Sequence, residues 1–345
     1  MEVRGDFLLE GEYRVGVQAS TDTAEARRVA MQLAACLGFD DAEAGGVGLV
    51  VTEAARNLLK HAGGGEVMIR TFDHAGTAGV EVLSLDKGPG IENVGRSFQD
   101  GYSTAGTPGT GLGAISRLSS VHDIYTQLGH GTALLARMCK RSLSPAVADF
   151  ESGAVSVPKR GESVCGDAWG FYPNSSSARL VVADGLGHGL LAAEASCSAV
   201  RTAEEHPDLS GVRLMERIHQ ALRPTRGAAI AIAEVHAGRG LVQFTGIGNI
   251  SGVLLAPSGA VQRMVSHPGT AGHEIHRIVE FQYAWHPGSL LVLHSDGVSA
   301  NWSLERYPGL AGRHPSLIAG VLYRDHHRER DDATVAVVWH AGSRN

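Results

Sequence analysis

Residues 84–113 constrain the fold of this chain most, because they combine the end of an apolar strand with two glycine clusters. The apolar run 80–85 predicts a buried strand, and this strand ends on a carboxylate, Asp86. The Gly-Pro-Gly sequence at 88–90 then predicts a tight turn, because glycine adopts positive φ at little steric cost. We therefore expect the chain to leave a sheet at Asp86 and to turn sharply.

The second glycine cluster, residues 109–113, opens an apolar run at 112–118 that is compatible with a helix. Backbone amides at the start of a helix suit a phosphate chain. An acid at a strand end, followed roughly twenty residues later by an anion site, suggests a nucleotide. The alternative is that the glycines form only a loop, and the spacing alone leaves both interpretations open.

Composition limits the class of protein. The chain has 345 residues, enough for two domains with substantial cores, and 43% of them are hydrophobic, so a folded globular protein is expected. A net charge of −6 without a dominant basic patch argues against nucleic acid and anionic membranes as partners. No stretch reaches the length of a membrane span, the N-terminus lacks a signal-peptide core, and the four cysteines lack metal-ligand spacing. We expect reduced thiols in a cytoplasmic protein.

A predicted helix at 41–62 carries Glu53, Asn57 and His61, and their spacing of four places them on one face. Asn57 offers a neutral oxygen that can complete a Mg²⁺ shell beside triphosphate oxygens. Glu53, one turn earlier, can orient or deprotonate an attacking hydroxyl, and Asp86 can accept a hydrogen bond from an exocyclic amine such as that of adenine. The alternative is that Glu53 and Asn57 are solvated residues of a helix face and that Asp86 only helps to form a turn. His61 is interpreted as a packing or capping residue.

The remaining pattern of the first half predicts a sheet with helices on one face. Strands are expected at 13–17, 66–72, 79–86, 121–127 and 132–140, and helices at 21–37, 41–62 and 112–118. This order predicts a mixed sheet. Residues 141–149 have no clear periodicity and are interpreted as a linker between domains at 1–140 and 150–345.

Three motifs of the first half resemble the three boxes of the GHKL ATPase superfamily. They are Glu53-x-x-x-Asn57-x-x-x-His61-Ala62, Asp86-x-Gly88-Pro89-Gly90-Ile91 and Gly109-Thr110-Gly111-Leu112-Gly113. The short lid at 100–107 resembles that of the serine kinases of bacterial partner-switching and stressosome systems, which phosphorylate a STAS-domain antagonist. No dimerising histidine-phosphoacceptor helix is visible, so a two-component histidine kinase is not favoured.

The resemblance, which covers residues 10–140, implies a binding site for ATP. In it, Asn57 holds Mg²⁺, Glu53 assists the target serine, Asp86 reads adenine and the glycine lid wraps the phosphates. The implied ATP contacts are Asn57, Asp86, Gly88, Gly90, Ile91, Thr104, Gly109, Thr110, Gly111, Leu112 and Gly113.

The second half changes to many short strands. They are expected at 153–157, 168–172, 179–183, 228–235, 241–246, 252–256, 290–293 and 334–339, with helices at 190–204, 212–222 and 314–323. This order fits stacked sheets with helices outside. Asp167, Asp184, Asp296 and the pair Asp331-Asp332 stand where these strands begin or end.

Such acids are expensive to gather without a cation. Their hard oxygens suit Mg²⁺ or Mn²⁺, and two such ions roughly 3.5–4 Å apart can activate a water for in-line attack on phosphorus. The alternative is that each Asp-Gly is only a hairpin turn. Four acids at four apolar strand ends favour the metal site.

These pieces resemble the metal-dependent PPM (type 2C) protein phosphatases, in the sporulation and stress-regulator branch, over residues 150–340. The resembling residues are Cys165-Gly166-Asp167-Ala168-Trp169, Asp184-Gly185-Leu186-Gly187-His188-Gly189, Gly246-Ile247-Gly248-Asn249, Ser295-Asp296-Gly297 and Asp331-Asp332-Ala333-Thr334. The resemblance implies that Asp184 bridges two metals and is the catalytic residue of this half. The carbonyl of Gly185 and the side chains of Asp167, Asp296 and Asp331 complete the sites. Asp331 is preferred to Asp332. His188 either touches a metal-bound water or stabilises its turn.

Together these resemblances imply an α+β protein: a two-layer GHKL-like sandwich followed by an αββα phosphatase sandwich. The expected function is a bifunctional partner-switching regulator, a protein serine kinase and a phosphoserine or phosphothreonine phosphatase. Its expected cofactors are ATP, Mg²⁺ and Mn²⁺. Its expected partners are STAS-domain antagonists, with a sigma factor or downstream regulator beside them. Two alternatives stay open for the first half: an anti-sigma binding module that regulates the phosphatase without kinase turnover, and a nucleotide sensor.

Overall fold

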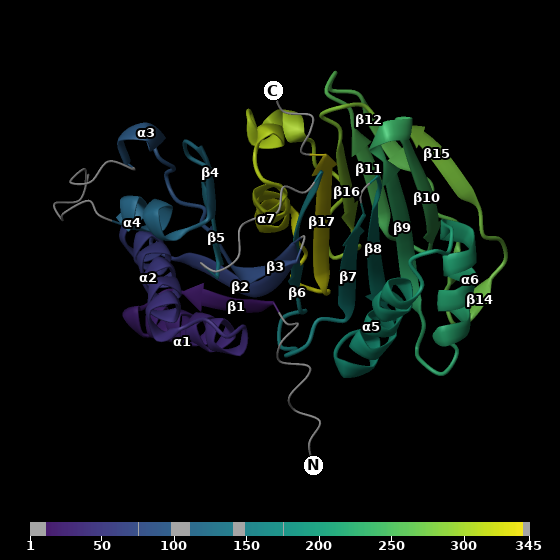
Figure 1. The fold of residues 1–345 in the computed structure, drawn as a ribbon, viewed down its shortest axis with the longest axis horizontal. Helices are drawn as coiled ribbons and strands as arrows, with labels where there is room; N and C mark the ends of the chain where they lie inside the picture. Colours follow the sequence, from purple (N-terminus) through teal and green to yellow (C-terminus); the bar gives the residue numbers. More distant parts are fainter. Residues whose placement is uncertain (1–11, 75, 98–110, 141–148, 175, 341–345) are drawn as a thin grey trace, which may run out of the picture. The chain divides into compact units, whose positions relative to one another are not determined.

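The computed structural model describes residues 12–74, 76–97, 111–140, 149–174 and 176–340. Internal contacts divide the chain into two compact units, one of residues 1–147 and 305–313 and the other of residues 148–304 and 314–345. Each unit has its own sheets and helices (Figure 1). The expected linker at 141–149 lies, except for Asp149, outside the described residues, so its bounds stay a prediction.

The first unit contains one five-stranded sheet with the strand order β1-β2-β3-β5-β4. The strands are β1 (Tyr13–Val17), β2 (Gly65–His74), β3 (Thr77–Leu85), β4 (Val121–Gln127) and β5 (Gly131–Cys139). Every neighbouring pair is antiparallel, so the predicted mixed sheet is wrong in this detail. The reason is connectivity, because β2 with β3 and β4 with β5 are hairpins whose short turns reverse the chain.

The helices of this unit cover one face of the sheet. They are α1 (Ser20–Cys36), α2 (Asp41–Asn57), the π turn η1 (Leu58–Ala62), α3 (Val94–Ser97) and α4 (Gly111–Leu118). The core between the layers includes Val51 and Ala55 of α2 with Val67 and Val82 of the sheet. Asp40 starts α2 through a capping box, since its Oδ1 accepts from the Glu43 N–H at 2.7 Å and the Glu43 carboxylate accepts from the Asp40 N–H.

The predicted single helix at 41–62 changes character within its last turn. Regular α-helix ends at Asn57, and residues 58–62 form a π turn that Gly63 terminates with φ of 72°. Glycine is favoured there because the left-handed conformation carries no Cβ penalty.

The second unit is built on two five-stranded sheets with the orders β15-β10-β9-β8-β7 and β12-β11-β16-β17-β6, and every neighbouring pair is antiparallel. The strands are β6 (Phe150–Val157), β7 (Asp167–Pro173), β8 (Ala178–Gly185), β9 (Ala228–His236), β10 (Leu241–Ile247), β11 (Ser251–Leu255), β12 (Val261–Met264), β13 (Gly269–Thr270), β14 (Glu274–Ile275), β15 (Glu280–Ala284), β16 (Leu290–His294) and β17 (Ala333–His340).

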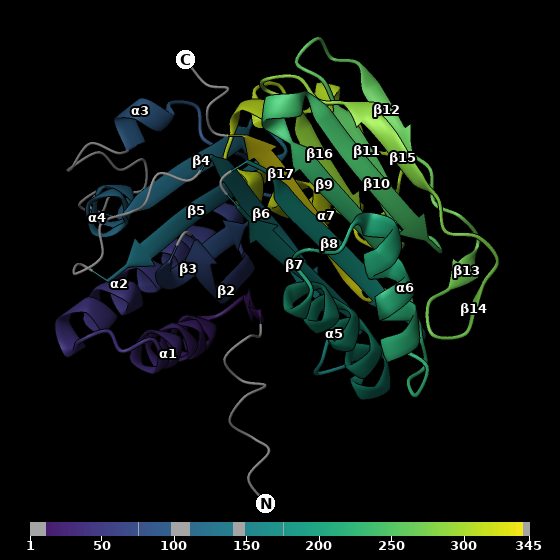
Figure 2. The ribbon, with the colours of Figure 1, turned by 45° about the vertical axis from the view of Figure 1, so that its right-hand side comes forward.

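Helices cover the outer faces of these sheets. α5 (Leu190–Glu205) packs on β7 and β8, α6 (Gly211–Ala221) packs on β9 and β10, and α7 (Pro315–His326) packs on β6 and β17 (Figure 2). One core lies between the two sheets and another lies under α5 and α6. The resulting αββα order confirms the predicted fold class. A short 3₁₀ turn of this unit lies at Ala237–Arg239, and two more, at Leu304–Arg306 and Leu310–Gly312, fall largely in the segment 305–313 that is assigned to the first unit.

Among the described residues, no helix combines the length and the apolar character needed to cross a bilayer.

Candidate functional site

The acids of the second unit come from strand ends of both sheets. Asp167 begins β7 and lies directly opposite Asp184 of β8 in the antiparallel register. Asp296 follows β16, and the pair Asp331-Asp332 precedes β17, its neighbour in the other sheet. The fold therefore brings all the predicted phosphatase acids to one end of the sandwich.

The electrostatics show that these carboxylates share one region. Burial, followed by the charges of Asp167, Asp296, Asp331 and Asp332, raises the pKa of Asp184 to about 9. Burial also raises the pKa of Asp167 to about 7, although the Ser295 hydroxyl opposes the shift. The pKa of Asp296 and that of Asp332 are raised as well, in both cases mainly by burial. Like charges in a poorly solvated place disfavour ionisation.

Framework hydrogen bonds fix one oxygen on each of two acids, Asp167 and Asp296. The Ser295 hydroxyl donates to Asp167 Oδ2 at 2.7 Å, and the Thr334 N–H donates to the same hydroxyl at 3.0 Å. Asn249 Nδ2 donates to Asp296 Oδ2 at 2.6 Å. These bonds hold the carboxylates in place against their mutual repulsion.

Two of the remaining carboxylate oxygens need a positive partner. Asp167 Oδ1 and Asp332 Oδ2 are buried without a hydrogen bond, which is costly for a charged group. An all-oxygen set of this kind suits Mg²⁺ or Mn²⁺, so the residues present fit such ions. Among the described residues, no three His, Cys, Asp or Glu side chains stand at metal-ligand spacing.

The two residues of the pair Asp331-Asp332 differ in how far their side chains are exposed to solvent. Asp332 is 3% exposed and its Oδ1 accepts from the Lys159 N–H at 2.8 Å, whereas Asp331 is exposed and its Oδ1 accepts from the Asp332 N–H. Asp332 is thus tied to the framework, and Asp331 keeps a carboxylate that solvent can reach. The choice of Asp331 as ligand stays a prediction. Gly185 is required by space, because a Cβ there would lie 2.0 Å from the Ala192 carbonyl oxygen.

Sequence reasoning assigned no role to Ser295, Asn249 or Glu162. His188 Nδ1 donates to Glu162 Oε1 at 2.7 Å, and both side chains are partly exposed. Ser295 and Asn249 belong to two of the phosphatase-like motifs, and this membership is the sequence signal that could have identified them as partners of the acids. Glu162 gave none, because its partner lies 26 residues away.

The nucleotide motifs of the first unit meet around the end of α2. A Cβ built on Gly111 would lie 2.9 Å from Glu53 Oε2 and 3.6 Å from Asn57 Oδ1, so the start of α4 rests on the face that carries both side chains. Glu53 Oε1 also accepts from Arg56 at 3.0 Å. Leu112 packs against the core, and Gly113 is buried.

The loop after β3 packs on the same helix end. Asp86 Oδ1 accepts from the N–H groups of Gly88 at 2.8 Å and Thr132 at 3.1 Å. A Cβ on Gly88 would lie 2.7 Å from that of Ala62, which places the loop against η1. The structure therefore brings Glu53, Asn57 and Gly111 together and sets the Asp86 loop on the turn that follows Asn57.

Further contacts fix this loop. Gly90 has φ of 81°, and a Cβ there would lie 2.7 Å from the Gln127 carbonyl oxygen. The Ile91 N–H donates to the Thr126 hydroxyl at 2.9 Å. Burial, and then Lys60, lowers the pKa of His61, while Asp86 opposes the shift. The predicted contacts Thr104, Gly109 and Thr110, and the lid at 100–107, lie outside the described residues.

Comparison with known proteins assigns both halves. Residues 18–138 match the histidine kinase-like ATPase domain family, and residues 174–339 match the stage II sporulation protein E (SpoIIE) family. Over 122 residues the chain is 30% identical to the serine/threonine-protein kinase RsbT of Bacillus subtilis (strain 168), a match that covers 35% of this chain and 92% of RsbT. The chain belongs to the histidine kinase-like ATPase family and also carries a SpoIIE-type phosphatase domain.

The phosphatase domain has relatives of its own. It is 27% identical over 141 residues to the phosphoserine phosphatase RsbX of Bacillus subtilis (strain 168), covering 41% of this chain and 71% of RsbX. The crystal structure of RsbX in complex with magnesium superposes with a TM-score of 0.52 at 22% identity, over 57% of this chain and 98% of that one, and shows the shared fold. The predicted fusion of an ATPase domain with a phosphatase domain is confirmed.

Proposed function

We propose that this chain is a bifunctional partner-switching regulator. Its ATPase domain transfers the γ-phosphoryl group of ATP to a serine of a STAS-domain antagonist, and its phosphatase domain removes phosphate from phosphoserine or phosphothreonine. The observation that carries the phosphatase half is the convergence of five aspartates from both sheets. The likeness to a kinase and a phosphoserine phosphatase supports the pairing. We propose that the regulator acts in the cytoplasm, because the proposed kinase reaction needs ATP.

In the phosphatase domain, Asp167, Asp184, Asp296, Asp331 and the Gly185 carbonyl would hold two Mg²⁺ or Mn²⁺ ions. When bound, such ions stabilise charge on phosphoryl oxygens and turn water into a nucleophile at neutral pH. The chain's own residues fix the ligands. Ser295 holds Asp167 and Asn249 holds Asp296, so neither carboxylate needs to reorganise during the reaction.

In the ATPase domain, Asn57 would hold Mg²⁺ and Glu53 would orient or deprotonate the attacking serine hydroxyl. The close approach of Gly111 to both side chains supports a phosphate position at the start of α4. Asp86, fixed by two backbone N–H groups, would read the adenine amine. The proposed ATP contacts also include Gly88, Gly90, Ile91, Thr104, Gly109, Thr110, Leu112 and Gly113.

The ion pair between Glu53 and Arg56 supports one alternative. It occupies the carboxylate that would receive the serine proton, so the domain would bind ATP and a partner without transferring phosphate. In that case the ATPase domain regulates the phosphatase as a binding module. ATP binding without transfer to any STAS-domain protein would establish this alternative.

The deciding experiment mixes the full chain with γ-labelled ATP, Mg²⁺ and a candidate STAS-domain protein. Asn57→Ala should abolish labelling of that protein, and Asp184→Ala should abolish release of phosphate from the labelled protein. Each variant controls for the other, since each should keep the activity of the untouched domain. Labelling that survives Asn57→Ala would remove the kinase assignment.

Opposed catalysts that act freely on one substrate would only consume ATP. We therefore propose that the two domains either take different substrates or regulate each other. Simultaneous turnover of one substrate by both domains, unaffected by nucleotide or partner, would contradict this.

A further inference from the structure

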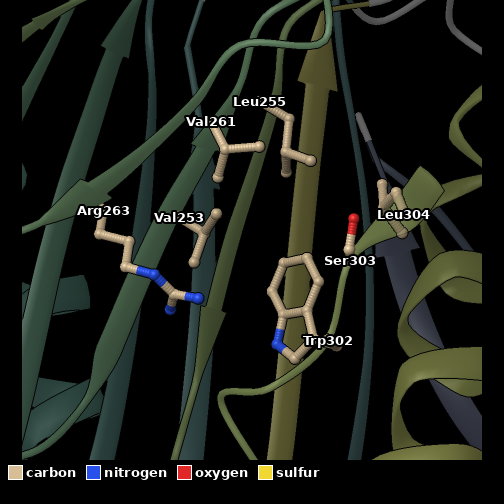
Figure 3. A pocket seen from close by; sticks show the side chains of 7 residues that line it. All are labelled: Val253, Leu255, Val261, Arg263, Trp302, Ser303 and Leu304. Atoms are coloured by element: carbon tan, nitrogen blue, oxygen red, sulfur yellow. The ribbon is translucent and has the colours of Figure 1, made fainter. Parts of the chain in front are cut away.

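We propose that a groove beside strand β12 binds an extended, acidic segment of a partner protein, and that its occupation is transmitted to Asp167 of the phosphatase domain. The groove, called here the Trp302 groove, has a volume of about 380 Å³ (Figure 3). It is lined by Val253, Leu255, Val261, Arg263, Trp302, Ser303 and Leu304.

The register of two strands creates the groove. Val253 pairs with Arg263 and Leu255 pairs with Val261, so these four side chains share one face of the sheet. The opposite face gives Leu254 and Met264 to the core between the sheets. Figure 3 shows Trp302 standing across the groove from Arg263 and Val253.

The lining selects the chemistry of the occupant. Val261 is 51% exposed and Val253 is buried, so the groove has an apolar lining that is partly open to solvent. The exposed Arg263 donates through Nη2 to the Ala300 carbonyl oxygen at 3.2 Å, which holds the guanidinium at the rim. A guanidinium beside valines suits a segment that carries carboxylates next to aliphatic side chains.

The position of β12 selects an extended occupant. In the described part of the chain, β12 is the end strand of its sheet. An end strand presents backbone N–H and C=O groups with which an incoming strand can pair. Every second side chain of such a strand would face the groove, so an aliphatic side chain would lie against Val261 and an acidic side chain two positions along would meet Arg263.

A chain of hydrogen bonds leads from the groove to the acids. The Trp302 indole N–H donates to His294 Nε2 at 3.3 Å, so the imidazole proton lies on Nδ1, which donates to the Ser295 carbonyl at 2.9 Å. The Ser295 hydroxyl in turn donates to Asp167 Oδ2. His294 and Ser295 are essentially fully buried, so water does not compete for these hydrogen bonds. A movement of Trp302 would therefore be passed along the bonds to the Asp167 carboxylate.

The docking part of this inference stands without the phosphatase, whereas the coupling part rests on the proposed function. The test therefore reads binding and turnover separately. The full chain is labelled with ¹⁵N in its tryptophans, and the Trp302 indole resonance is assigned from its loss in Trp302→Phe. The probe is a blocked heptapeptide with valine and glutamate in turn at its odd positions and threonine at its even positions, so that valine and glutamate share one face. Its comparator has lysine in place of glutamate.

We expect the glutamate peptide to shift the Trp302 resonance saturably and the lysine peptide to leave it unchanged. Arg263→Gln should weaken binding by about tenfold, because a charge-assisted hydrogen bond is lost. Arg239→Gln, which changes an exposed arginine outside the groove, should bind like the wild type. No saturable shift, equal binding of both peptides, or a shift confined to Trp169, Trp285 or Trp339 would overturn the docking site.

For the coupling, hydrolysis of a phosphoserine peptide is measured with Mn²⁺ at saturating glutamate peptide. The rate of the wild type should change. Trp302→Phe keeps an aromatic side chain but loses the N–H donor at His294, and it should bind the peptide, as measured by isothermal titration, without a change in rate. An unchanged wild-type rate with the peptide bound contradicts the coupling. No hydrolysis at any peptide concentration contradicts the proposed function instead, and the resonance shift still decides the docking site.

Discussion

The two candidate sites hold their charges in opposite ways. In the phosphatase domain, five carboxylates are gathered where burial and mutual repulsion raise the pKa of Asp184 to about 9. In the ATPase domain, the carboxylate of Asp86 is held by two backbone N–H groups, and its companion Asn57 is neutral. The nucleotide site is therefore stable as polypeptide alone, whereas the acid cluster opposes folding until cations neutralise it.

The largest expected effect separates the sites by one chemical change made in each. Asp184→Asn should abolish phosphate release, yet raise the melting temperature of the chelated protein at neutral pH, because folding then no longer requires a buried carboxyl group to take up a proton. Asp86→Asn should lower the melting temperature, because two charge-assisted bonds are weakened, by about 2–4 °C for each kcal/mol lost. Calorimetry of both variants in the presence of chelator measures the direction of each change in melting temperature. A lowered melting temperature for Asp184→Asn would break the comparison.

The same contrast should appear in the pH dependence of stability. Asp167 and Asp184 have folded pKa values of about 7 and about 9, above the unfolded value near 4. Their contribution to stability is fully present below the unfolded pKa and is lost as pH rises through the folded values. The chelated phosphatase transition should therefore move to lower temperature between about pH 5 and pH 9.

Saturating Mn²⁺ should oppose this trend, because the ligands must be deprotonated to bind it and binding stabilises the folded state. Melting curves with chelator and with Mn²⁺ should thus diverge as pH rises. Asp184→Asn should flatten the chelated curve at its alkaline end. Parallel curves across this range would show that the acids do not share one site.

A smaller effect tests the framework of the acid cluster. Ser295→Ala removes the hydroxyl that binds Asp167 Oδ2 and should weaken Mn²⁺ affinity by about 10–100-fold. Ser258→Ala, which changes an exposed serine in a turn, is the matched control. Isothermal titration of Mn²⁺ measures both. Wild-type affinity in Ser295→Ala would mean that Asp167 is oriented by the strands alone.

Strands with a continuous apolar run could be predicted from the sequence, together with the acids at their ends. β8, β16 and β17 are buried along most of their length, and the aspartates beside them stood out for that reason. β12 and β15 were not predicted, because their residues are largely polar or exposed and only pairing with distant strands makes them extended. The π turn after Asn57 was also missed, since its residues favour continuing the α-helix.

The partners of the site residues escaped prediction for a related reason. The bond from Ser295 to Asp167 joins residues 128 positions apart, and that from Lys159 to Asp332 joins residues 173 apart. No local pattern encodes such pairs. The converse holds for Glu53 and Asn57, whose shared helix face follows from spacing alone and which Gly111 then meets in space.

The smallest expected effect concerns the place where Gly111 approaches the side chains of Glu53 and Asn57. An added methyl at Gly111 would crowd the Glu53 carboxylate, the flexible end of a side chain, and not the backbone. Gly111→Ala should therefore keep the wild-type melting temperature while displacing Glu53, which lowers phosphoryl transfer by about tenfold. Gly45→Ala, on helix α2 that also carries Glu53 but with open space around its Cβ, should transfer at the wild-type rate. If Gly111→Ala instead unfolds the ATPase domain, the glycine serves packing. If transfer is unchanged, Glu53 takes no part in the reaction, and the binding-module alternative gains its strongest support.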